Sequence, residues 1–277
     1  MSAMSGRDWR VPVLTYHAST VGGPDYAGND HVAFASDLET ATRLGWRIVP
    51  LQWVVEQRLG LADRDLTRCL ALSCDDGTVL DVHDVDYPGQ GRQPSFLTLL
   101  EATDGQPDRH LTCFVIASPE ARARMDRDCL HGLDWMGEHW WAPALAGGRI
   151  GIGNHSWDHN HPVMAEPGPG NMPRGDFHVV ADDPRADYEI RQAADYLVAR
   201  LGQGACPLFA YPYGHAPDFL VRDWFPRHGA RLGLQAAFGT QGGAVGPGSD
   251  PWHLPRYVCG LHWSSPAQFE ALLASLA

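Results

Sequence analysis

The sequence predicts an α/β fold, a distorted barrel of the (β/α)7 type in a single domain, and three observations support this prediction. Short apolar runs alternate with longer stretches of helical period, which is typical of a largely parallel sheet. The length of 277 residues suits one barrel, since α/β barrels commonly reach about 250 residues. No repeat, low-complexity tract or shift in composition marks a second domain, so residues 1–277 are expected to form one unit.

Eight apolar runs of five to seven residues are the candidate strands. They include VPVLTYH, CLALSC and LTCFVI, which are rich in the β-branched and aromatic residues that suit a pleated sheet. In chain order these runs begin at Val11, Trp46, Cys69, Leu111, Arg149, Pro207, Leu234 and Leu254.

Helices are expected between most of these strands. Residues 34–45 and 190–202 have apolar side chains at spacings of three and four, and each stretch ends at a glycine. Ser118-Pro119 and Ser265-Pro266 are each typical of an N-cap followed by a first-turn proline. A further helix is expected around Trp140-Trp141, where both rings are predicted to pack in the core.

Two stretches interrupt this alternation. Residues 81–92 follow the third candidate strand and are predicted to form an acidic loop. Residues 161–184 are rich in proline, glycine and aspartate, and they are predicted to form a surface insertion.

The composition excludes several classes of function. Acidic residues outnumber basic ones by 33 to 21, so the net charge of −12 argues against a nucleic-acid partner. All the basic residues are arginine, which excludes Schiff-base catalysis by lysine and a phosphate-binding loop ending in Gly-Lys. The six cysteines form no CxxC pair, so buried reduced thiols are expected rather than a zinc ribbon.

No part of the sequence predicts association with a membrane. No apolar run approaches the roughly 20 residues of a membrane span, and the first residues lack the apolar core of a signal peptide. We therefore expect a cytoplasmic chain as written, secreted only if a leader has been removed. The sequence carries no indication of oligomeric state.

Three polar clusters stand directly after candidate strands. Asp75-Asp76-Gly77 follows LALSC, residues 155–159 (HSWDH) follow RIGIG, and residues 211–214 (YPYG) follow PLFA. Because the carboxyl ends of parallel strands face a common mouth in α/β barrels, these clusters are expected to meet in space. Each cluster alone is typical of a turn or of chance, but the three together favour a site.

The residue types in these clusters suit metal chemistry. His155 and His159 are four residues apart, and one carboxylate added to them gives a ligand set with positions left for water and substrate. Zinc in such a site lowers the pKa of its water to about 7. Two adjacent aspartates allow one to bind the metal while the other acts as a general base. A non-haem iron centre uses the same ligand types, although the early position of the acid makes it a poorer fit.

The order of these motifs resembles the polysaccharide deacetylase family, the NodB-homology group of carbohydrate esterase family four. LSCDDGT resembles that family's Thr-Phe-Asp-Asp-Gly motif, and GNHSWDH resembles its His-Ser/Thr-x-x-His motif. LTYH and FAYPYG are most similar to the poly-N-acetylglucosamine deacetylase branch. The resemblance extends from about Val11 to the carboxyl-terminal third, and it implies a barrel of about seven βα units.

The resemblance also implies an activity, a cofactor and site residues. Asp76, His155 and His159 would bind a divalent metal, usually zinc, with cobalt and nickel as alternatives. Asp75 would be the general base, and the backbone N–H of Tyr213 would help to hold the oxyanion. The implied reaction removes acetyl groups from an N-acetylated sugar or polysaccharide.

The sequence departs from the family pattern at several positions. Ala210 stands where many members have an arginine that orients the catalytic aspartate, and Arg256 is the candidate replacement. The family's fourth motif, with its Asp and Trp, is missing. A late histidine is expected as the general acid, and His262 is favoured over His253 because it follows a candidate strand.

Other residues of the same region are expected near the site. Cys74 replaces the aromatic residue of the first motif. His17, at the end of the first candidate strand, points toward the same mouth and is expected either to touch substrate or to support the site. Asp158 and Asn160 are expected to orient the imidazoles.

Two alternative functions remain open from the sequence. The same fold would suit an amidase or deformylase acting on a small non-polymeric substrate. A catalytically silent carbohydrate-binding domain with a structural metal is the second alternative, although it would have no need for the spare aspartate.

Overall fold

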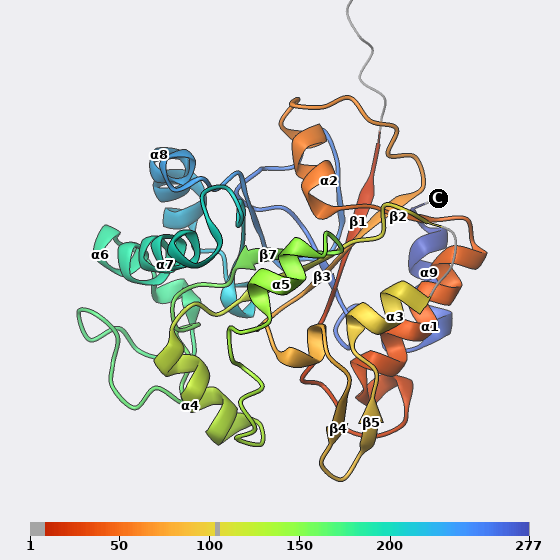
Figure 1. Cartoon of the computed structure of the whole chain (residues 1–277). Helices are drawn as coiled ribbons and strands as arrows, with labels where there is room; N and C mark the ends of the chain where they lie inside the picture. Colours follow the sequence, from red (N-terminus) through yellow and green to blue (C-terminus); the bar gives the residue numbers. More distant parts are fainter. Residues whose placement is uncertain (1–8, 103–105, 277) are drawn as a thin grey trace, which may run out of the picture.

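A curled sheet of mostly parallel strands forms the centre of the molecule (Figure 1). The structure is a computed structural model that describes residues 9–102 and 106–276. Its strands in chain order are β1 (Val11–Tyr16), β2 (Arg47–Ile48), β3 (Cys69–Cys74), β4 (Val85–Tyr87), β5 (Gly91–Gln93), β6 (Leu111–Val115), β7 (Ile150–Asn154), β8 (Leu208–Ala210), β9 (Ala236–Phe238), β10 (Ala244–Val245) and β11 (Tyr257–Val258).

The main sheet has the order β10-β1-β3-β6-β7-β8-β9, with β2 beside β3 and β11 beside β1. Near the end of the chain, Leu254 bridges Phe238 of β9 in parallel, and β11 then pairs in parallel with Leu14 and Thr15 of β1. Residues 254–258 therefore connect the two ends of the curl. The predicted α/β fold, a distorted barrel, is confirmed.

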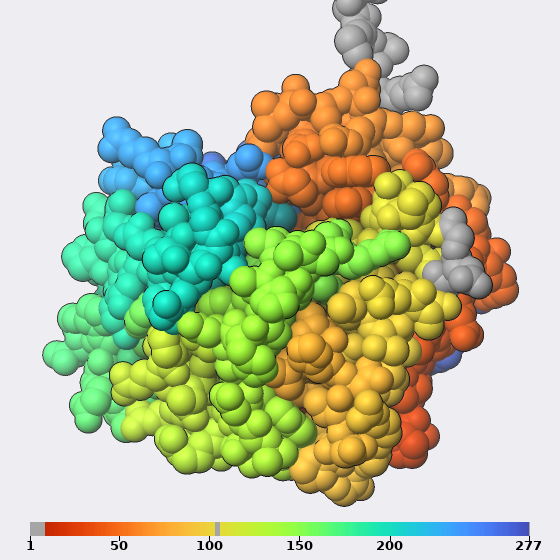
Figure 2. Space-filling model, viewed as in Figure 1, coloured from red at the N-terminus to blue at the C-terminus, as the bar shows by residue number. Residues whose placement is uncertain are grey.

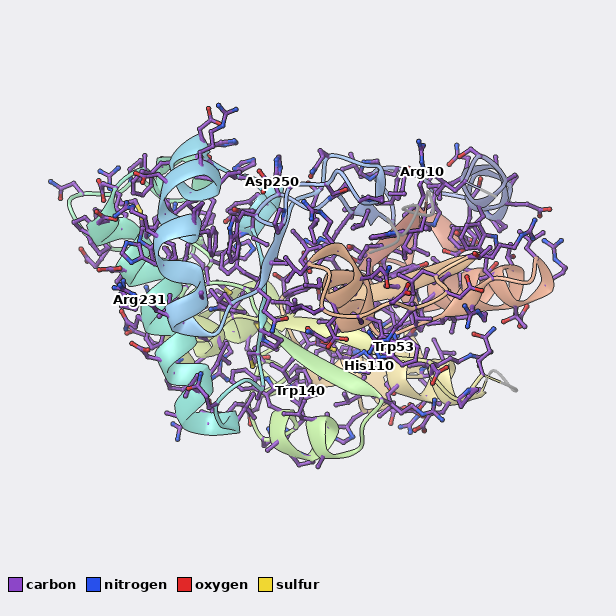
Figure 3. The ribbon with its side chains drawn as sticks, turned by 90° about the horizontal axis from the view of Figure 1, so that it is seen from above. Arg10, Trp53, His110, Trp140, Arg231 and Asp250 are labelled. Atoms are coloured by element: carbon purple, nitrogen blue, oxygen red, sulfur yellow. The ribbon has the colours of Figure 1, made fainter. Side chains whose placement is uncertain are left out.

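Helices lie on the outside of the curled sheet (Figure 3). Ser118 and Ser265 accept hydrogen bonds from the backbone N–H groups of Ala121 and Gln268, which confirms both predicted N-caps. The α-helices of the described chain are α1 (Asp30–Arg43), α2 (Leu51–Arg58), α3 (Phe96–Ala102), α4 (Pro119–Cys129), α5 (Trp141–Ala146), α6 (Asp183–Ala186), α7 (Gln192–Leu201), α8 (Phe225–His228) and α9 (Pro266–Ala274).

The core consists of the strands and the inner faces of these helices. All residues of β3 and β6 are buried. Trp140 and Trp141, at the start of α5, are both buried, as predicted, and α5 packs beside β7 (Figure 3). The residues of α5, coloured green, cross the middle of the face in Figure 2. No helix in the described part of the chain is long and apolar enough to cross a membrane.

The predictions for two short segments need correction. Residues 81–92 do not form only an acidic loop, because β4 and β5 pair there as an antiparallel hairpin (Figure 1). Arg92 on β5 lies 3.6 Å from Asp84 and 3.9 Å from Asp86, so the acidic side chains face a cation across the hairpin. β10, which was not predicted, pairs antiparallel with β1. β4 and β5 are short and mostly polar and exposed, and β10 has only two residues, so none of them stands in an apolar run that would predict a strand.

Residues 161–184 are mostly irregular, with one bridge between Gly168 and Met172 and a 3-10 turn at Phe177–Val179. Met172, Phe177 and Val180 are nevertheless fully buried among the side chains that cover β8 and α8. The segment predicted to be a surface insertion thus contributes to the core.

The predicted burial of the thiols holds only in part. Cys69, Cys74 and Cys113 are buried, Cys206 and Cys259 are half-buried, and Cys129 is exposed.

Candidate active site

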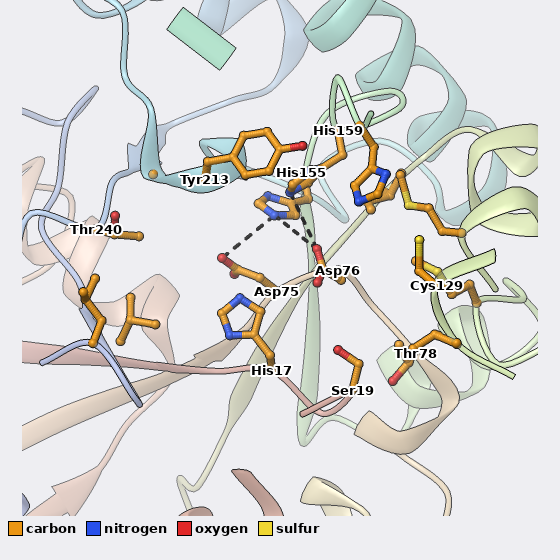
Figure 4. A pocket seen from close by; sticks show the side chains of 18 residues that line it. His17, Ser19, Asp75, Asp76, Thr78, Cys129, His155, His159, Tyr213 and Thr240 are labelled. Carbon is orange, nitrogen blue, oxygen red and sulfur yellow. Dashed lines mark ion pairs between the residues drawn. The ribbon is translucent and has the colours of Figure 1, made fainter. Parts of the chain in front are cut away.

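The carboxyl ends of β3, β7 and β8 meet at a cavity of about 490 Å³ (Figure 4). Asp75 and Asp76 follow β3, His155 and His159 follow β7, and Tyr213 follows β8. All five residues line the cavity. The convergence expected from the order of strands and polar clusters is therefore present.

Three side chains in this cavity are arranged as ligands of one ion. The Nε2 atoms of His155 and His159 lie 3.8 and 3.7 Å from Oδ1 of Asp76. Two ligands of a tetrahedral zinc, each about 2.0–2.1 Å from the ion, lie about 3.3 Å apart. A small inward adjustment would bring all three atoms into that geometry, so these residues fit a divalent metal.

The surroundings of both imidazoles support this fit. Nδ1 of His155 lies 2.9 Å from the carbonyl oxygen of Ala210, which can only accept a hydrogen bond. Nδ1 must therefore carry a proton, which leaves Nε2, on the side of Asp76, as the ring nitrogen available to a metal. Burial, with a smaller contribution from the neighbouring His155, lowers the pKa of His159 to about 3, so that this ring is neutral at physiological pH.

The turns that carry these side chains have unusual backbone angles. Of the eight non-glycine residues with positive φ in the described chain, five lie in the turns of the site, namely Asp76, Ser156, His159, Asn160 and Tyr213. Each such residue costs on the order of 1–3 kcal/mol, except that Asp and Asn tolerate the conformation better. The glycine of the Asp-Asp-Gly motif has a steric reason as well, because a Cβ on Gly77 would lie 2.6 Å from Val115 Cγ1.

Arg256 holds Asp75 through two hydrogen bonds. Its NH1 and NH2 groups donate to Oδ1 and Oδ2 of Asp75 over 2.7 and 2.8 Å, and both side chains are buried. Burial alone would raise the pKa of Asp75, but the charge of Arg256, with a smaller contribution from His155, outweighs burial and holds the pKa well below its usual range. Arg256 thus pairs with Asp75 in a chain that has alanine, and not arginine, at position 210.

A second arginine, which sequence reasoning missed, supports the turn that carries the histidines. NH1 of Arg174 donates to both carboxylate oxygens of Asp158, over 2.9 and 2.8 Å, and the hydroxyl of Tyr188 donates to Oδ2 over 2.7 Å. Asn160 donates to the backbone oxygens of Pro173 and Asp176. Nothing in the local sequence around Arg174 indicates this contact, because its partner is 16 residues away.

The late histidines lie elsewhere than expected. Neither His253 nor His262 is among the described residues that line the cavity. Nδ1 of His262 accepts a hydrogen bond from the Val258 backbone N–H, and its other ring nitrogen faces Gly242. His17 does line the cavity, on the side of Asp75 (Figure 4). The expectation that barrel geometry brings His262 to the site is therefore corrected, because its ring folds back on its own turn.

The carboxylates and imidazoles lie at the carboxyl ends of the strands of a curled α/β sheet, which is where the active sites of α/β-barrel enzymes assemble. The chain belongs to the polysaccharide deacetylase family, whose model matches residues 63–230. The family implies a deacetylase, a hydrolase that acts on acetylated carbohydrate. The resemblance inferred from the motifs is thereby confirmed at the level of the family.

Solved structures support the same fold. IcaB from Ammonifex degensii is 17% identical with a TM-score of 0.64, and the alignment covers 97% of each chain. The Streptococcus pyogenes deacetylase PplD, solved with acetate, is 17% identical with a TM-score of 0.62 over 96% of this chain and 99% of that one. A polysaccharide deacetylase from Bacillus cereus is 15% identical with a TM-score of 0.62, over 96% and 69%. No curated protein gives a significant match.

Proposed function

We propose that this protein is a metal-dependent hydrolase that removes the acetyl group from an N-acetylated sugar. The observation that supports the proposal best is the contrast between two adjacent carboxylates in one cavity. Asp75 is held by Arg256, whereas Asp76 faces the two imidazoles. Two neighbouring acids with different surroundings are the arrangement expected when one binds a metal and the other moves a proton.

Asp76, His155 and His159 would hold the metal, with zinc as the first candidate and cobalt or nickel as alternatives. When bound, such an ion lowers the pKa of water and polarises a carbonyl group. The carbonyl oxygen of Ala210 keeps the lone pair of His155 directed at the site. Loss of this hydrogen bond would leave the ring free to turn and would weaken the ligand set.

Asp75 accepts the proton of the attacking water in this proposal. Its depressed pKa keeps the carboxylate ionised throughout the neutral range, so it is ready to act as a base. Arg256 positions it by fixing both oxygens. The backbone N–H of Tyr213 would donate to the oxyanion that forms as water attacks the carbonyl.

His17 is the proposed proton donor to the leaving amine. It lines the cavity at the end of β1 and faces Asp75 from the side opposite His155 (Figure 4). Its backbone N–H donates to Oδ2 of Asp30 over 2.7 Å, which fixes the start of the loop that carries it. A histidine is suited to donate a proton near neutral pH.

A second candidate function is hydrolysis of a small amide that carries an apolar group. One wall of the cavity offers hydrocarbon or sulfur rather than hydrogen-bonding groups, and its residues are Ile116, Met125, Cys129, Leu130 and Met136. A sugar hydroxyl placed against such a wall would lose its hydrogen bonds. An apolar substituent would instead gain about 25 cal/mol per Å² of buried surface.

The first experiment measures acetate release from N-acetylglucosamine oligomers. Chelated protein should be inactive, and restored zinc or cobalt should return the activity. Asp75→Asn should abolish turnover yet retain metal, whereas His155→Ala should lower the metal content. A panel of simple amides run beside the sugars separates the two candidates. An active Asp75→Asn protein would refute the assignment of the base, and turnover of apolar amides alone would favour the second function.

A further inference from the structure

A second group of metal-ligand side chains lies outside the cavity. Asp176 precedes the 3-10 turn that contains His178, and His215 directly follows the Pro212–Gly214 turn. Nδ1 of His178 lies 3.0 Å from Oδ1 of Asp176, and Nδ1 of His215 lies 2.9 Å from the same oxygen. None of the three residues lines the active-site cavity.

The geometry of His215 differs from that of an ordinary hydrogen bond. Nδ1 of His215 is buried and has no hydrogen-bond partner, although the Asp176 oxygen is only 2.9 Å away. The oxygen therefore lies off the direction in which this nitrogen would donate a proton. Two ligands of one ion, each about 2.0–2.1 Å from it, lie about 2.9–3.4 Å apart with the ion to one side of the line that joins them.

The other two members of the group are suited to the same ion. The rings of His178 and His215 are stacked, with centroids 4.2 Å apart and planes 30° apart, so both Nδ1 atoms face Asp176. The backbone N–H of His178 donates to Oδ1 of Asp176 over 2.8 Å, which fixes the carboxylate between the two rings. The group therefore combines a carboxylate with two imidazoles, which are common zinc ligands.

We propose that Asp176, His178 and His215 form a second binding site for a divalent transition-metal ion, most suited to zinc, that is separate from the active site. The group is half-exposed, so the remaining coordination positions are open to water. This inference concerns residues that have no part in the proposed reaction, so it does not depend on the proposed function.

The position of the site gives the ion a structural role. The backbone oxygen of Asp176 accepts a hydrogen bond from Asn160, which adjoins the metal-ligand residue His159. On the other side, the His215 ring lies 5.5 Å from that of Tyr213, and the Tyr213 ring lies 4.4 Å from that of His159. An ion on this site would join residues 176–178, which contact Asn160 of the turn after β7, to the turn after β8.

Zinc binding by the whole protein tests the proposal. The chain is stripped of metal, dialysed to equilibrium against buffered zinc, and its zinc content is measured per chain. The wild type should bind two zinc ions, and both Asp176→Asn and His178→Ala should bind one. Asp176→Asn keeps an oxygen that can accept the His178 N–H, so its fold should be retained, which circular dichroism checks. His228→Ala removes a histidine 3.9 Å from Asp183 and is the matched control that should still bind two.

The same measurement on His155→Ala separates the two sites. His155→Ala should bind one zinc ion, and the double variant Asp176→Asn/His155→Ala should bind none. One zinc ion in the wild type that persists in Asp176→Asn but is lost in His155→Ala would overturn the second site and leave the proposed active site intact. One zinc ion that persists in His155→Ala but is lost in His178→Ala would support the second site and refute the ligands of the first.

Discussion

Asp75 and Asp76 are adjacent in the chain, yet their carboxylates have different surroundings. The Asp75 side chain is 7% exposed and receives two hydrogen bonds from Arg256, whereas the Asp76 side chain is 31% exposed and faces two imidazoles. The left-handed backbone of Asp76, with φ of 73°, allows the chain to turn between them. This local turn separates the two acids into different environments.

At this scale, removing the guanidinium should change both stability and pH dependence. Arg256→Met leaves the buried Asp75 carboxylate without its partner, which should lower the free energy of unfolding by about 3–5 kcal/mol. It should also raise the pKa of Asp75, since burial then acts without the opposing charge. The acid limb of kcat/KM against pH should therefore move to higher pH.

The pH dependence of stability follows from the difference between the pKa values of Asp75 in the folded and unfolded states. The folded pKa of Asp75 is depressed, so the pair stabilises the protein above the pKa of an unfolded aspartate, about 3.9, and this contribution is lost as pH falls toward the folded pKa. Urea unfolding at several pH values measures it. Arg256→Lys, which keeps the charge but not the paired geometry, should restore part of the activity. An unmoved acid limb in Arg256→Met would contradict the role of Arg256.

At the scale of elements, the turn after β7 depends on a segment that follows it in the chain. Residues 155–160 contain three left-handed residues, and Arg174 and Tyr188 hold this turn through Asp158. Glu189 adds the backbone oxygen that accepts the Trp157 N–H over 2.7 Å. Burial, with a smaller contribution from the nearby Asp158, raises the pKa of Glu189, which favours the neutral form of its carboxyl group. The strained turn is thus fixed from outside the cavity.

Arg174→Gln should therefore weaken metal binding at the active site. Loss of the ion pair frees Asp158 and the turn that carries both histidines, so we expect a drop in zinc affinity of about 10–100-fold. Competition with a chromophoric chelator in the Asp176→Asn background measures the active site alone. Arg222→Gln, which removes an exposed arginine paired with Asp218, is the matched control. Equal zinc affinities in the two variants would show that the ion pair between Arg174 and Asp158 does not support His155 and His159.

The sequence predicted the elements that have a strong local pattern. The strand candidates coincide with β1, β2, β3, β6, β7, β8, β9 and β11, because their apolar runs are buried and bounded by turns. The hairpin of β4 and β5 was missed, since its stability depends on pairing between short polar segments.

The two histidines proposed as metal ligands are close in the sequence, so the pair could be predicted from its spacing, and Arg256 was proposed as the partner of Asp75 because the family arginine is missing. The contact between Arg174 and Asp158 was not readable, because it depends on how an irregular segment folds back. His262 was favoured on its place after a strand, but a hydrogen bond within its own turn directs the ring elsewhere. Sequence patterns thus predict which strand end a residue follows, but not where its side chain points.

At the scale of the whole molecule, the chain from Leu254 to Val258 joins the two ends of the sheet and carries Arg256. Leu254 is fully buried, and its backbone pairs with Ala237 and Gly239. Because the closing segment also supplies the partner of Asp75, the closure of the barrel and the assembly of the site depend on the same five residues.

Leu254→Ala should consequently affect stability and activity together. The cavity it creates should cost about 2–5 kcal/mol, and a shift of the segment would move Arg256 relative to Asp75. Leu273→Ala, in the buried face of α9, is the matched control and should cost a similar free energy of unfolding without lowering kcat. Both are measured by urea unfolding and by turnover well below the melting temperature. Equal kcat values in the two folded variants would contradict the coupling.

The separation between Asp75 and Arg256 also has a consequence for the timing of biosynthesis. The two residues are 181 positions apart, so a ribosome adding about 5–20 residues per second makes Arg256 roughly 10–40 s after Asp75. During that interval the nascent chain lacks Arg256, the residue that pairs with this carboxylate in the folded protein, and burying the unpaired carboxylate would be costly. The emerging polypeptide should therefore keep the end of β3 hydrated, and catalytic competence should arise late in translation.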